Sequence, residues 1–311
     1  MRQTLLSIGF VSVVLGWSPA WAQSARPIDS PASDYRISLN VDLVVLPITV
    51  HDRNGGFASN LTERDFKIYE NGTLQSLRLF RHEDVPVTVG LVIDHSGSMK
   101  TKMPEVVAAA RTFVRVSNPS DQMFVVNFNE KVGIGLPPAI PFSDQAGELE
   151  AAIEKSPATG QTALYDALSV ALDRLRTGDR PKKVLIVISD GGDNASLLTL
   201  PAVLKLAGES NAVIYTVGIF EPQDADRNPD VLRRLARATG GESFFPAERN
   251  EVVAICERIA DDIRHQYTLG YVSANSAGSA AYRTIRVTAT APGKSLEVRT
   301  RAGYFPIVGP K

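Results

Sequence analysis

A short loop with one carboxylate and two hydroxyls carries the residue types that most directly suggest chemistry in this sequence. Asp94, Ser96 and Ser98 occupy alternate positions in the segment Asp-His-Ser-Gly-Ser. Such a set of oxygen donors suits a hard divalent cation such as Mg²⁺, and does not suit zinc or copper. Gly97 lets the loop turn without a Cβ in the way. The residue types therefore predict a site for a hard metal ion.

The elements around this loop should place it at the edge of a sheet. The apolar run Val87–Ile93 directly precedes the loop and predicts a buried strand. In open α/β sheets, ligands bind at the carboxyl ends of strands. Beyond the loop, strand patterns alternate with helix patterns, which predicts an α/β fold: a doubly wound, mostly parallel sheet with helices on both faces. We expect strands at 87–93, 121–128, 131–135, 183–188, 213–219 and 243–245, and helices at 103–116, 146–155, 163–176, 200–208, 229–238 and 251–265.

The loop and two later segments together resemble the metal-ion-dependent adhesion site (MIDAS) of von Willebrand factor A (VWA) domains. The segment DHSGSM matches the D-x-S-x-S signature of that family at Asp94, Ser96 and Ser98. The family's loop threonine matches Thr162 in ATGQTALYDAL, and its second aspartate matches Asp190 in KKVLIVISDGGDN. The layout of the chain is also similar to bacterial VWA-related proteins found notably in Acidobacteria. That resemblance implies a fold and a site, and it gives no agreed partner.

The resemblance also implies how a cation would be held. Ser96, Ser98 and Thr162 would bind it directly, whereas Asp94 and Asp190 would act through water, or Asp190 directly in an unliganded state. Because hydroxyl ligands add no charge, Mg²⁺ would be opposed by two carboxylates only. It would then attract an Asp or Glu of a protein partner. We expect Mg²⁺, and Mn²⁺ or Ca²⁺ would also be compatible.

Each of these residues has an ordinary structural interpretation as well. Asp94 and Asp190 could be solvated loop carboxylates, and the hydroxyls could cap the helices that follow them. We favour the metal site because every residue stands where that site requires it. Asp193 and Asn194 extend the second loop and either support the ligands or form a surface turn. We expect His95 to be exposed and not catalytic.

The sequence carries no convincing catalytic motif. An aspartate after a first strand is weakly similar to haloacid-dehalogenase-like phosphatases, but Ser96 stands where their general acid would be. There is no G-x-S-x-G elbow, no Walker or Rossmann glycine pattern and no triad context for any histidine. We therefore expect no enzyme. The formal net charge of −1 also argues against a nucleic-acid binder.

Two classes of function remain open. The favoured one is a secreted or envelope-associated adhesion or recognition module that binds a protein partner through MIDAS-held Mg²⁺. The alternative is a structural or assembly scaffold of a cell-envelope complex, in which the VWA domain has no metal-gated binding. Loss of partner binding on chelation, and in Ser98→Ala, would separate the first class from the second.

Both ends of the chain have β character. An Asn71-Gly72 pair between alternating segments predicts a hairpin with a type I′ turn. Neither end is long enough to bury a good core alone, so we expect the two to pair into one β-sandwich-like module. Two separate small β extensions are the alternative. The predicted divisions are a signal peptide (1–22), a disordered leader (23–35), the first half of the β module (36–84), the VWA domain (86–265), the second half of the β module (266–306) and a tail (307–311).

The first residues predict export. Arg2, a short apolar run at Leu5–Leu15 and an Ala-x-Ala pattern ending at Ala22 are typical of a secretory signal peptide. We expect a periplasmic or extracellular bacterial protein without a transmembrane segment after cleavage; an uncleaved anchor is the alternative. The single cysteine, Cys256, allows no intrachain disulfide, and its apolar surroundings predict a buried thiol.

Overall fold

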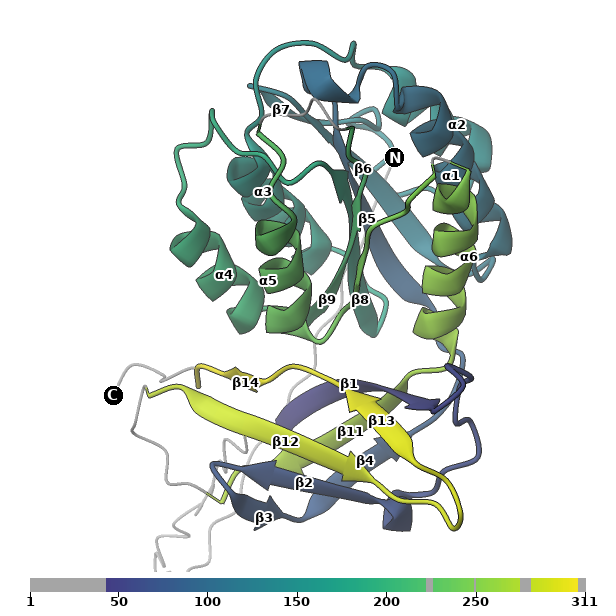
Figure 1. Ribbon diagram of the computed structural model, residues 1–311, viewed down its shortest axis with the longest axis vertical. Coiled ribbons are helices and arrows are strands. Elements are labelled where there is room, and N and C mark those ends of the chain that lie inside the picture. Colours follow the sequence, from purple (N-terminus) through teal and green to yellow (C-terminus); the bar gives the residue numbers. More distant parts are fainter. Residues whose placement is uncertain (1–42, 222–225, 249, 275–280, 307–311) are drawn as a thin grey trace, which may run out of the picture. The chain divides into compact units, whose positions relative to one another are not determined.

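The computed structural model describes residues 43–221, 226–248, 250–274 and 281–306, and a six-stranded sheet forms the core of its α/β part. Its strand order is β10-β9-β8-β5-β6-β7, and each neighbouring pair is parallel except β6 and β7. The strands are β5 (Val87–Asp94), β6 (Gln122–Phe128), β7 (Val132–Ile134), β8 (Lys182–Ser189), β9 (Ala212–Gly218) and β10 (Ser243–Phe244). The β5 strand lies between β8 and β6, so the predicted metal loop follows a central strand (Figure 1).

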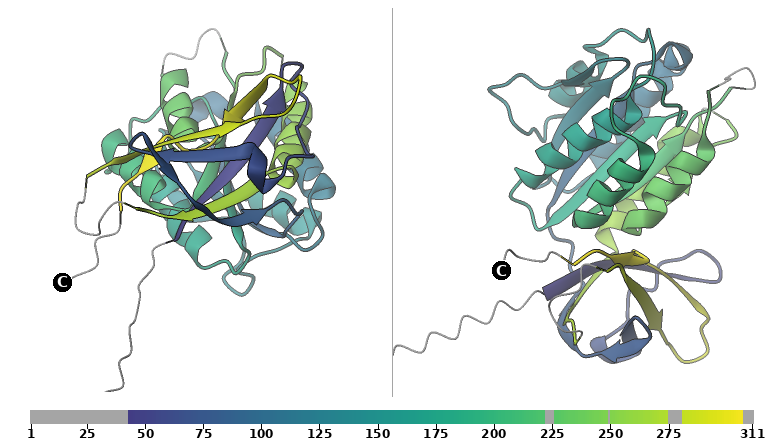
Figure 2. Two further views of the ribbon diagram at one scale, coloured as in Figure 1. Left: turned by 90° about the horizontal axis from the view of Figure 1, so that it is seen from below. Right: turned by 90° about the vertical axis from the view of Figure 1, so that its left-hand side faces the viewer.

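Helices cover both faces of this sheet. Figure 1 shows α1, α2 and α6 on one face and α3, α4 and α5 on the other, and the right-hand view of Figure 2 looks onto the second group. The helices are α1 (Met103–Val116), α2 (Ala146–Glu154), α3 (Leu164–Arg176), α4 (Leu200–Glu209), α5 (Pro229–Thr239) and α6 (Glu251–Arg264). The predicted doubly wound α/β class is confirmed, since strands joined by crossover helices build a parallel sheet between two helical layers.

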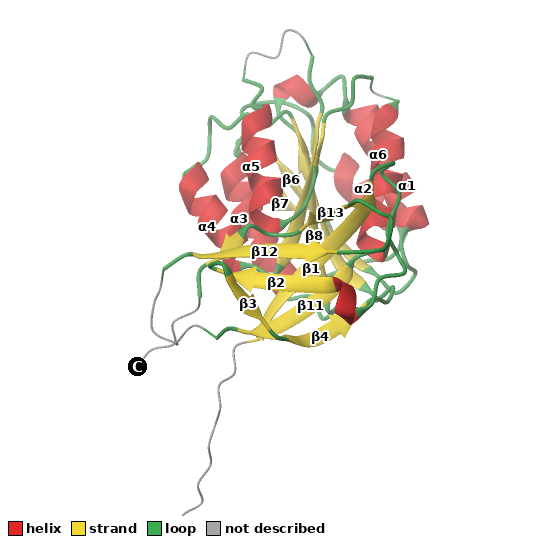
Figure 3. Cartoon of the chain, turned by 60° about the horizontal axis from the view of Figure 1, so that its bottom comes forward, coloured by secondary structure: helices red, strands yellow, loops and turns green. Residues whose placement is uncertain are grey.

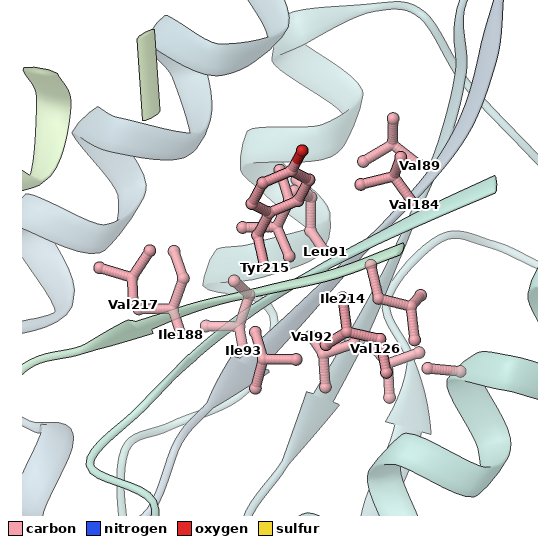
Figure 4. Close-up of a cluster of buried hydrophobic side chains, with 14 of the residues drawn as sticks. Val89, Leu91, Val92, Ile93, Val126, Val184, Ile188, Ile214, Tyr215 and Val217 are labelled. Atoms are coloured by element: carbon pink, nitrogen blue, oxygen red, sulfur yellow. The ribbon is translucent and has the colours of Figure 1, made fainter. Parts of the chain in front are cut away.

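Burial from both sides explains why the central strands are apolar throughout. Every residue of β5 is buried, and several of its side chains belong to the apolar cluster drawn in Figure 4, together with side chains of β8 and β9. Gly90 is required on this strand, because a Cβ there would lie 2.5 Å from the Phe124 ring and 2.6 Å from Leu185. The core is therefore closely packed directly beneath the loops of the predicted site.

Strands from the two ends of the chain form two further sheets (Figure 3). One has the order β13-β1-β11-β4 and the other the order β14-β12-β2-β3. Antiparallel pairs β1–β11 and β2–β12 join an early strand to a late one in each sheet. The expected flanking β structure from both chain ends is thus confirmed, whereas the exact domain limits stay a prediction. The strands are β1 (Leu43–Asp52), β2 (Phe66–Glu70), β3 (Thr73–Gln75), β4 (Leu77–Arg81), β11 (Tyr267–Val272), β12 (Arg283–Ala289), β13 (Leu296–Arg299) and β14 (Gly303–Tyr304).

A buried glutamate ties the two ends together at the level of side chains. Glu70 is fully buried and accepts hydrogen bonds from the hydroxyls of Tyr271 (2.7 Å) and Ser273 (2.6 Å), which come from the far end of the sequence. Arg283 approaches the same carboxylate at 3.4 Å and provides a compensating positive charge. Burial is the main cause that raises the pKa of the Tyr271 hydroxyl, with its hydrogen bond to Glu70 next, so the tyrosine acts as a stable donor.

The remaining expectations concern the ends of the chain, membrane-spanning helices and the single cysteine. The predicted signal peptide (1–22), leader (23–35) and tail (307–311) lie outside the described residues. In the parts of the chain that the structure describes, no helix combines the length and apolar character needed to cross a bilayer. Cys256 is buried, as expected, and burial raises the pKa of its thiol to about 12.

Candidate metal centre

The predicted ligand loops meet at one edge of the six-stranded sheet because of strand register. The parallel strands β5 and β8 are neighbours, and Ile93 lies opposite Ile188. Asp94 therefore ends its strand opposite Ser189, and Asp190 follows one residue later at the same edge. Two segments nearly a hundred residues apart are brought together by the pairing of the strands that precede them.

Asp94 is held rigidly by neutral donors. Its Oδ1 accepts the N–H of Ser96 at 2.8 Å, and its Oδ2 accepts the hydroxyl of Ser189 at 2.6 Å. The side chain is fully buried. The pKa of Asp94 is raised to about 6, mainly by burial; the hydrogen bonds from Ser189 and Ser96 oppose the rise, and the negative charge of Asp190 adds to it. The two carboxylates thus lie close enough to repel one another.

A chain of hydroxyls links Asp94's loop to the second aspartate. The hydroxyl oxygens of Ser96 and Ser98 are 3.1 Å apart, and Ser98 donates to Asp190 Oδ2 at 2.5 Å. The other oxygen of Asp190 accepts the N–H of Gly192 at 3.1 Å. Ser96 and Asp190 are buried, whereas Ser98 is exposed, so the chain runs from the interior to the surface. The short 3₁₀ turn at Gly97–Met99 presents the two serines on the same side.

Thr162 enters the same region through backbone contacts. Its N–H donates to the side-chain oxygen of Asn194 at 2.9 Å, and its carbonyl accepts the N–H of Asn194 at 2.9 Å. The preceding loop is joined to the first one, because the Gly97 N–H donates to the Gly160 carbonyl at 3.1 Å. The structure therefore connects all three predicted loops: Asp94, Ser96, Ser98 and Asp190 through hydrogen bonds that use their side chains, and Thr162 through its backbone.

The two residues left open after Asp190 have different roles. Asn194 contacts Thr162, which favours a supporting role over a simple surface turn. Asp193 instead accepts the N–H of Tyr165 at 3.1 Å and the hydroxyl of Ser196 at 2.5 Å, so it fixes the start of α3. Burial raises the pKa of Asp193, and its hydrogen bonds oppose the rise.

The expectation that His95 is exposed is wrong. The side chain is 1% exposed, and its Nε2 faces the side-chain oxygen of Asn127 at 3.2 Å. The backbone explains this: the His95 N–H donates to Phe128 O at 2.6 Å, and its carbonyl accepts the N–H of Thr159 at 2.8 Å. The loop is thus held on both sides, and the residue between Asp94 and Ser96 turns toward β6. Burial lowers the pKa of His95, which favours the neutral imidazole.

Sequence reasoning missed Ser189. Its hydroxyl donates to Asp94 and accepts the N–H of Gly191 at 3.0 Å, so it joins the two aspartate loops. A hydroxyl immediately before Asp190 on a neighbouring parallel strand was the available signal. It becomes informative only when the strand register is known.

The donor set fits a hard cation and no softer metal. In the described segments no three His, Cys, Asp or Glu side chains group together, as they would at a typical zinc site. The predicted set of two carboxylates and three hydroxyls lacks the nitrogen and sulfur ligands of zinc, and its oxygen atoms are those that Mg²⁺ prefers. Among the described residues no lysine or arginine pairs with Asp94 or Asp190, so a divalent cation would balance their two charges.

Comparison with known proteins decides the family. The model of the von Willebrand factor type A domain matches residues 88–257, more than half of the 311-residue chain. The chain belongs to the von Willebrand factor type A family. The match includes all the predicted ligand residues, from Asp94 to Asp190. VWA domains commonly bind a divalent metal at a MIDAS, whereas the metal-binding role of these five residues stays a prediction.

Known relatives of this VWA protein share only part of their length with it. Inter-alpha-trypsin inhibitor heavy chain H2 of Mus musculus is 29% identical over 171 residues, which are 51% of this chain and 18% of the relative. An uncharacterized protein of Synechocystis sp. is 28% identical over 176 residues, which are 54% of this chain and 40% of the relative. The chain thus spans less than half the length of either curated relative.

A solved VWA structure supports the fold over a longer stretch. The von Willebrand factor type A protein of Catenulispora acidiphila superposes with a TM-score of 0.52 at 15% identity, covering 85% of this chain and 75% of that one. At this identity the likeness concerns the fold alone.

Proposed function

We propose that this VWA protein is an exported adhesion or recognition module that binds a protein partner through a divalent cation. The cation would be Mg²⁺ by preference, and the partner would present an Asp or Glu. The residues that would hold the cation are Asp94, Ser96, Ser98, Thr162 and Asp190. When bound, the ion would supply an electrophilic position for a carboxylate oxygen from outside the chain.

The hydrogen-bonded series from Ser96 through Ser98 to Asp190, beside the buried Asp94, is the observation that carries this proposal. Buried carboxylates are costly unless a positive charge or several donors compensate them. Asp94 has neutral donors on both oxygens, and its neighbour Asp190 adds a second negative charge. A divalent cation at this edge would make the group formally neutral.

The serine hydroxyls give the site its particular character. A hydroxyl can turn its proton toward a carboxylate and keep its lone pairs for a cation, which a third carboxylate could not do without adding charge. Ser98 already donates to Asp190 in this way, and it is exposed, so the edge of the site faces solvent. A partner's acidic side chain would approach from that side.

A direct test measures metal binding and partner binding in the same protein. Thermal unfolding of the full chain should shift upward with Mg²⁺ concentration and return with EDTA, because a ligand that binds only the folded state stabilises it. Random linear peptides displayed on phage, selected in Mg²⁺ and eluted with EDTA, should be enriched in Asp or Glu.

Two variants control this test. Ser98→Ala should remove both the Mg²⁺ shift and the EDTA-sensitive peptides, and its exposed position leaves the core intact. Ser120→Ala changes an exposed serine in the turn before β6 and should behave as the unaltered chain. Binding that ignores EDTA and Ser98→Ala alike would instead favour the scaffold function without metal-gated binding.

A further inference from the structure

One leucine near the candidate metal centre is exposed to an unusual degree. Leu197, in the loop that joins β8 to α4, has 94% of its surface exposed. The next most exposed large apolar side chain in the described residues is Leu74, at 57%. The neighbouring Leu198 is partly buried, so the loop turns one leucine inward and the other out.

Hydrogen bonds fix the backbone that presents Leu197. The carboxylate of Asp166, in the first turn of α3, accepts the N–H groups of Leu197 and Leu198, each at 2.9 Å. One residue earlier, the Ser196 hydroxyl accepts the N–H of Tyr165 at 3.1 Å and the N–H of Asp166 at 3.2 Å. The loop therefore donates hydrogen bonds to the start of α3 and accepts others from it. An apolar side chain held this way loses little backbone freedom when a partner covers it.

The same loop carries one predicted metal ligand, Asp190, and Asn194, which contacts the predicted ligand Thr162, and this limits the distance between Leu197 and the centre. Leu197 follows Asn194 by three residues, so their Cα atoms are at most about 11 Å apart. Asn194 in turn contacts the Thr162 N–H at 2.9 Å. A standard protein interface covers roughly 800 Å² of each partner, a patch about 16 Å in radius. A partner held at the metal centre would extend over Leu197.

We propose that Leu197 is a specificity-determining anchor of this surface, and that the partner is a protein bearing an acidic side chain next to an apolar one. The acidic group would bind at the metal centre and the apolar group would cover Leu197. This inference rests on the proposed function, because it takes the metal centre as the first point of contact. It adds a second point of contact, at Leu197, and predicts which residue types the binding segment of the partner contains.

The apolar contact at Leu197 would let the surface discriminate between acidic partners. A metal-held carboxylate alone offers little discrimination between acidic surfaces, since every Asp or Glu presents the same group. Burying one leucine fully contributes enough free energy to change affinity by at least about tenfold. A few well-packed residues typically carry most of the binding free energy of an interface.

The test uses peptides from the phage selection described above, synthesised and titrated against the full chain in Mg²⁺. The EDTA-sensitive peptides should carry a bulky apolar residue within a few positions of the acidic one. Leu197→Ser should weaken their binding at least about tenfold, while Leu197→Met should retain it. Leu74→Ser is the matched control, because it removes an exposed leucine from β3 and should leave affinity unchanged.

The possible outcomes separate the two proposals. Leu197 contacts solvent almost entirely, so Leu197→Ser should keep the unfolding temperature and the Mg²⁺ shift of the unaltered chain. If peptide binding depends on Ser98 and EDTA but is the same in Leu197→Ser, the anchor is refuted and the metal-dependent function stands. If no EDTA-sensitive peptide is selected, the proposed function fails and the anchor fails with it.

Discussion

The Asn194 side chain holds the backbone of Thr162, one of the five predicted metal ligands. It receives the Thr162 N–H through its side-chain oxygen and returns a backbone hydrogen bond to the Thr162 carbonyl. We expect Asn194→Ala to weaken Mg²⁺ binding by about 10–100-fold, the usual effect of removing a group that orients a ligand. The measurement is the Mg²⁺ concentration at which the unfolding temperature begins to rise.

Asn118→Ala provides the comparison for this prediction. The side-chain oxygen of Asn118 accepts the N–H of Ser120 at 2.9 Å, a similar bond in a turn at the opposite edge of the sheet. Asn194 is exposed, so its replacement should leave the core unchanged. Equal Mg²⁺ responses in the two variants would mean that Thr162 keeps its place without Asn194.

At the scale of residues, the sequence identified the candidate ligands better than it predicted their burial and contacts. Asp94, Ser96 and Ser98 could be found because their spacing is local, and Asp190 because it follows a buried apolar run. The contact of Ser189 with Asp94 depends on the register of two strands that are distant in the sequence. The burial of His95 was missed for the same reason, since its loop is fixed by Phe128 and Thr159.

Two helix glycines allow a matched prediction at the scale of elements. Gly240 ends α5 in the left-handed region, with φ of 82°, and its N–H returns to carbonyls of the last turn. Gly208 lies within α4, where an added Cβ would meet nothing within 4 Å. We expect Gly240→Ala to lower the free energy of unfolding by at least about 1 kcal/mol, because alanine pays a steric cost at positive φ. Gly208→Ala should raise it by roughly 0.5–1 kcal/mol, because alanine restricts the unfolded chain and favours the helix.

Urea unfolding of both variants beside the unaltered chain measures these changes. The opposite signs matter more than the sizes, since both substitutions add the same methyl group near a helix end. A stabilising Gly240→Ala would show that α5 does not need the left-handed residue to end.

The elements themselves were predicted well where one hydrophobic pattern determined them. The α1 helix begins and ends where its apolar face predicts, and Asn71 and Gly72 both have positive φ, as a type I′ turn requires. The single strand expected after that turn is wrong. It divides at Ser76 into β3, which pairs with β2, and β4, which pairs with β11 in the other sheet. Alternation continues through such a corner, so periodicity alone cannot reveal that the chain changes sheets.

For the whole molecule, the register of the end strands indicates how the chain is assembled. Arg81 of β4 lies opposite Thr268 of β11 in an antiparallel pair, although the whole α/β region separates them in sequence. The buried apolar residues also divide into two clusters, one from 87 to 263 and one drawn only from the two ends. Both observations favour the predicted insertion of an α/β domain between adjacent strands of a β module. Sequence composition suggested this arrangement, but only strand pairing identifies the positions that the insertion separates.

This arrangement predicts that the β module folds without its insertion. By continuing the register, His82 would lie opposite Tyr267, and their rings stack with centroids 4.0 Å apart. Residues 43–82 joined by Asn-Gly to residues 267–306 would then close a hairpin with a two-residue type I′ turn. We expect this short chain to unfold cooperatively with heat, because every buried residue of the second cluster is retained. Circular dichroism should show β structure, and Ile68→Asp should abolish the transition by placing a charge at a fully buried position. If the short chain is unfolded while residues 86–265 fold alone, the ends need the α/β domain to hold β4 beside β11, and the module is not an independent unit.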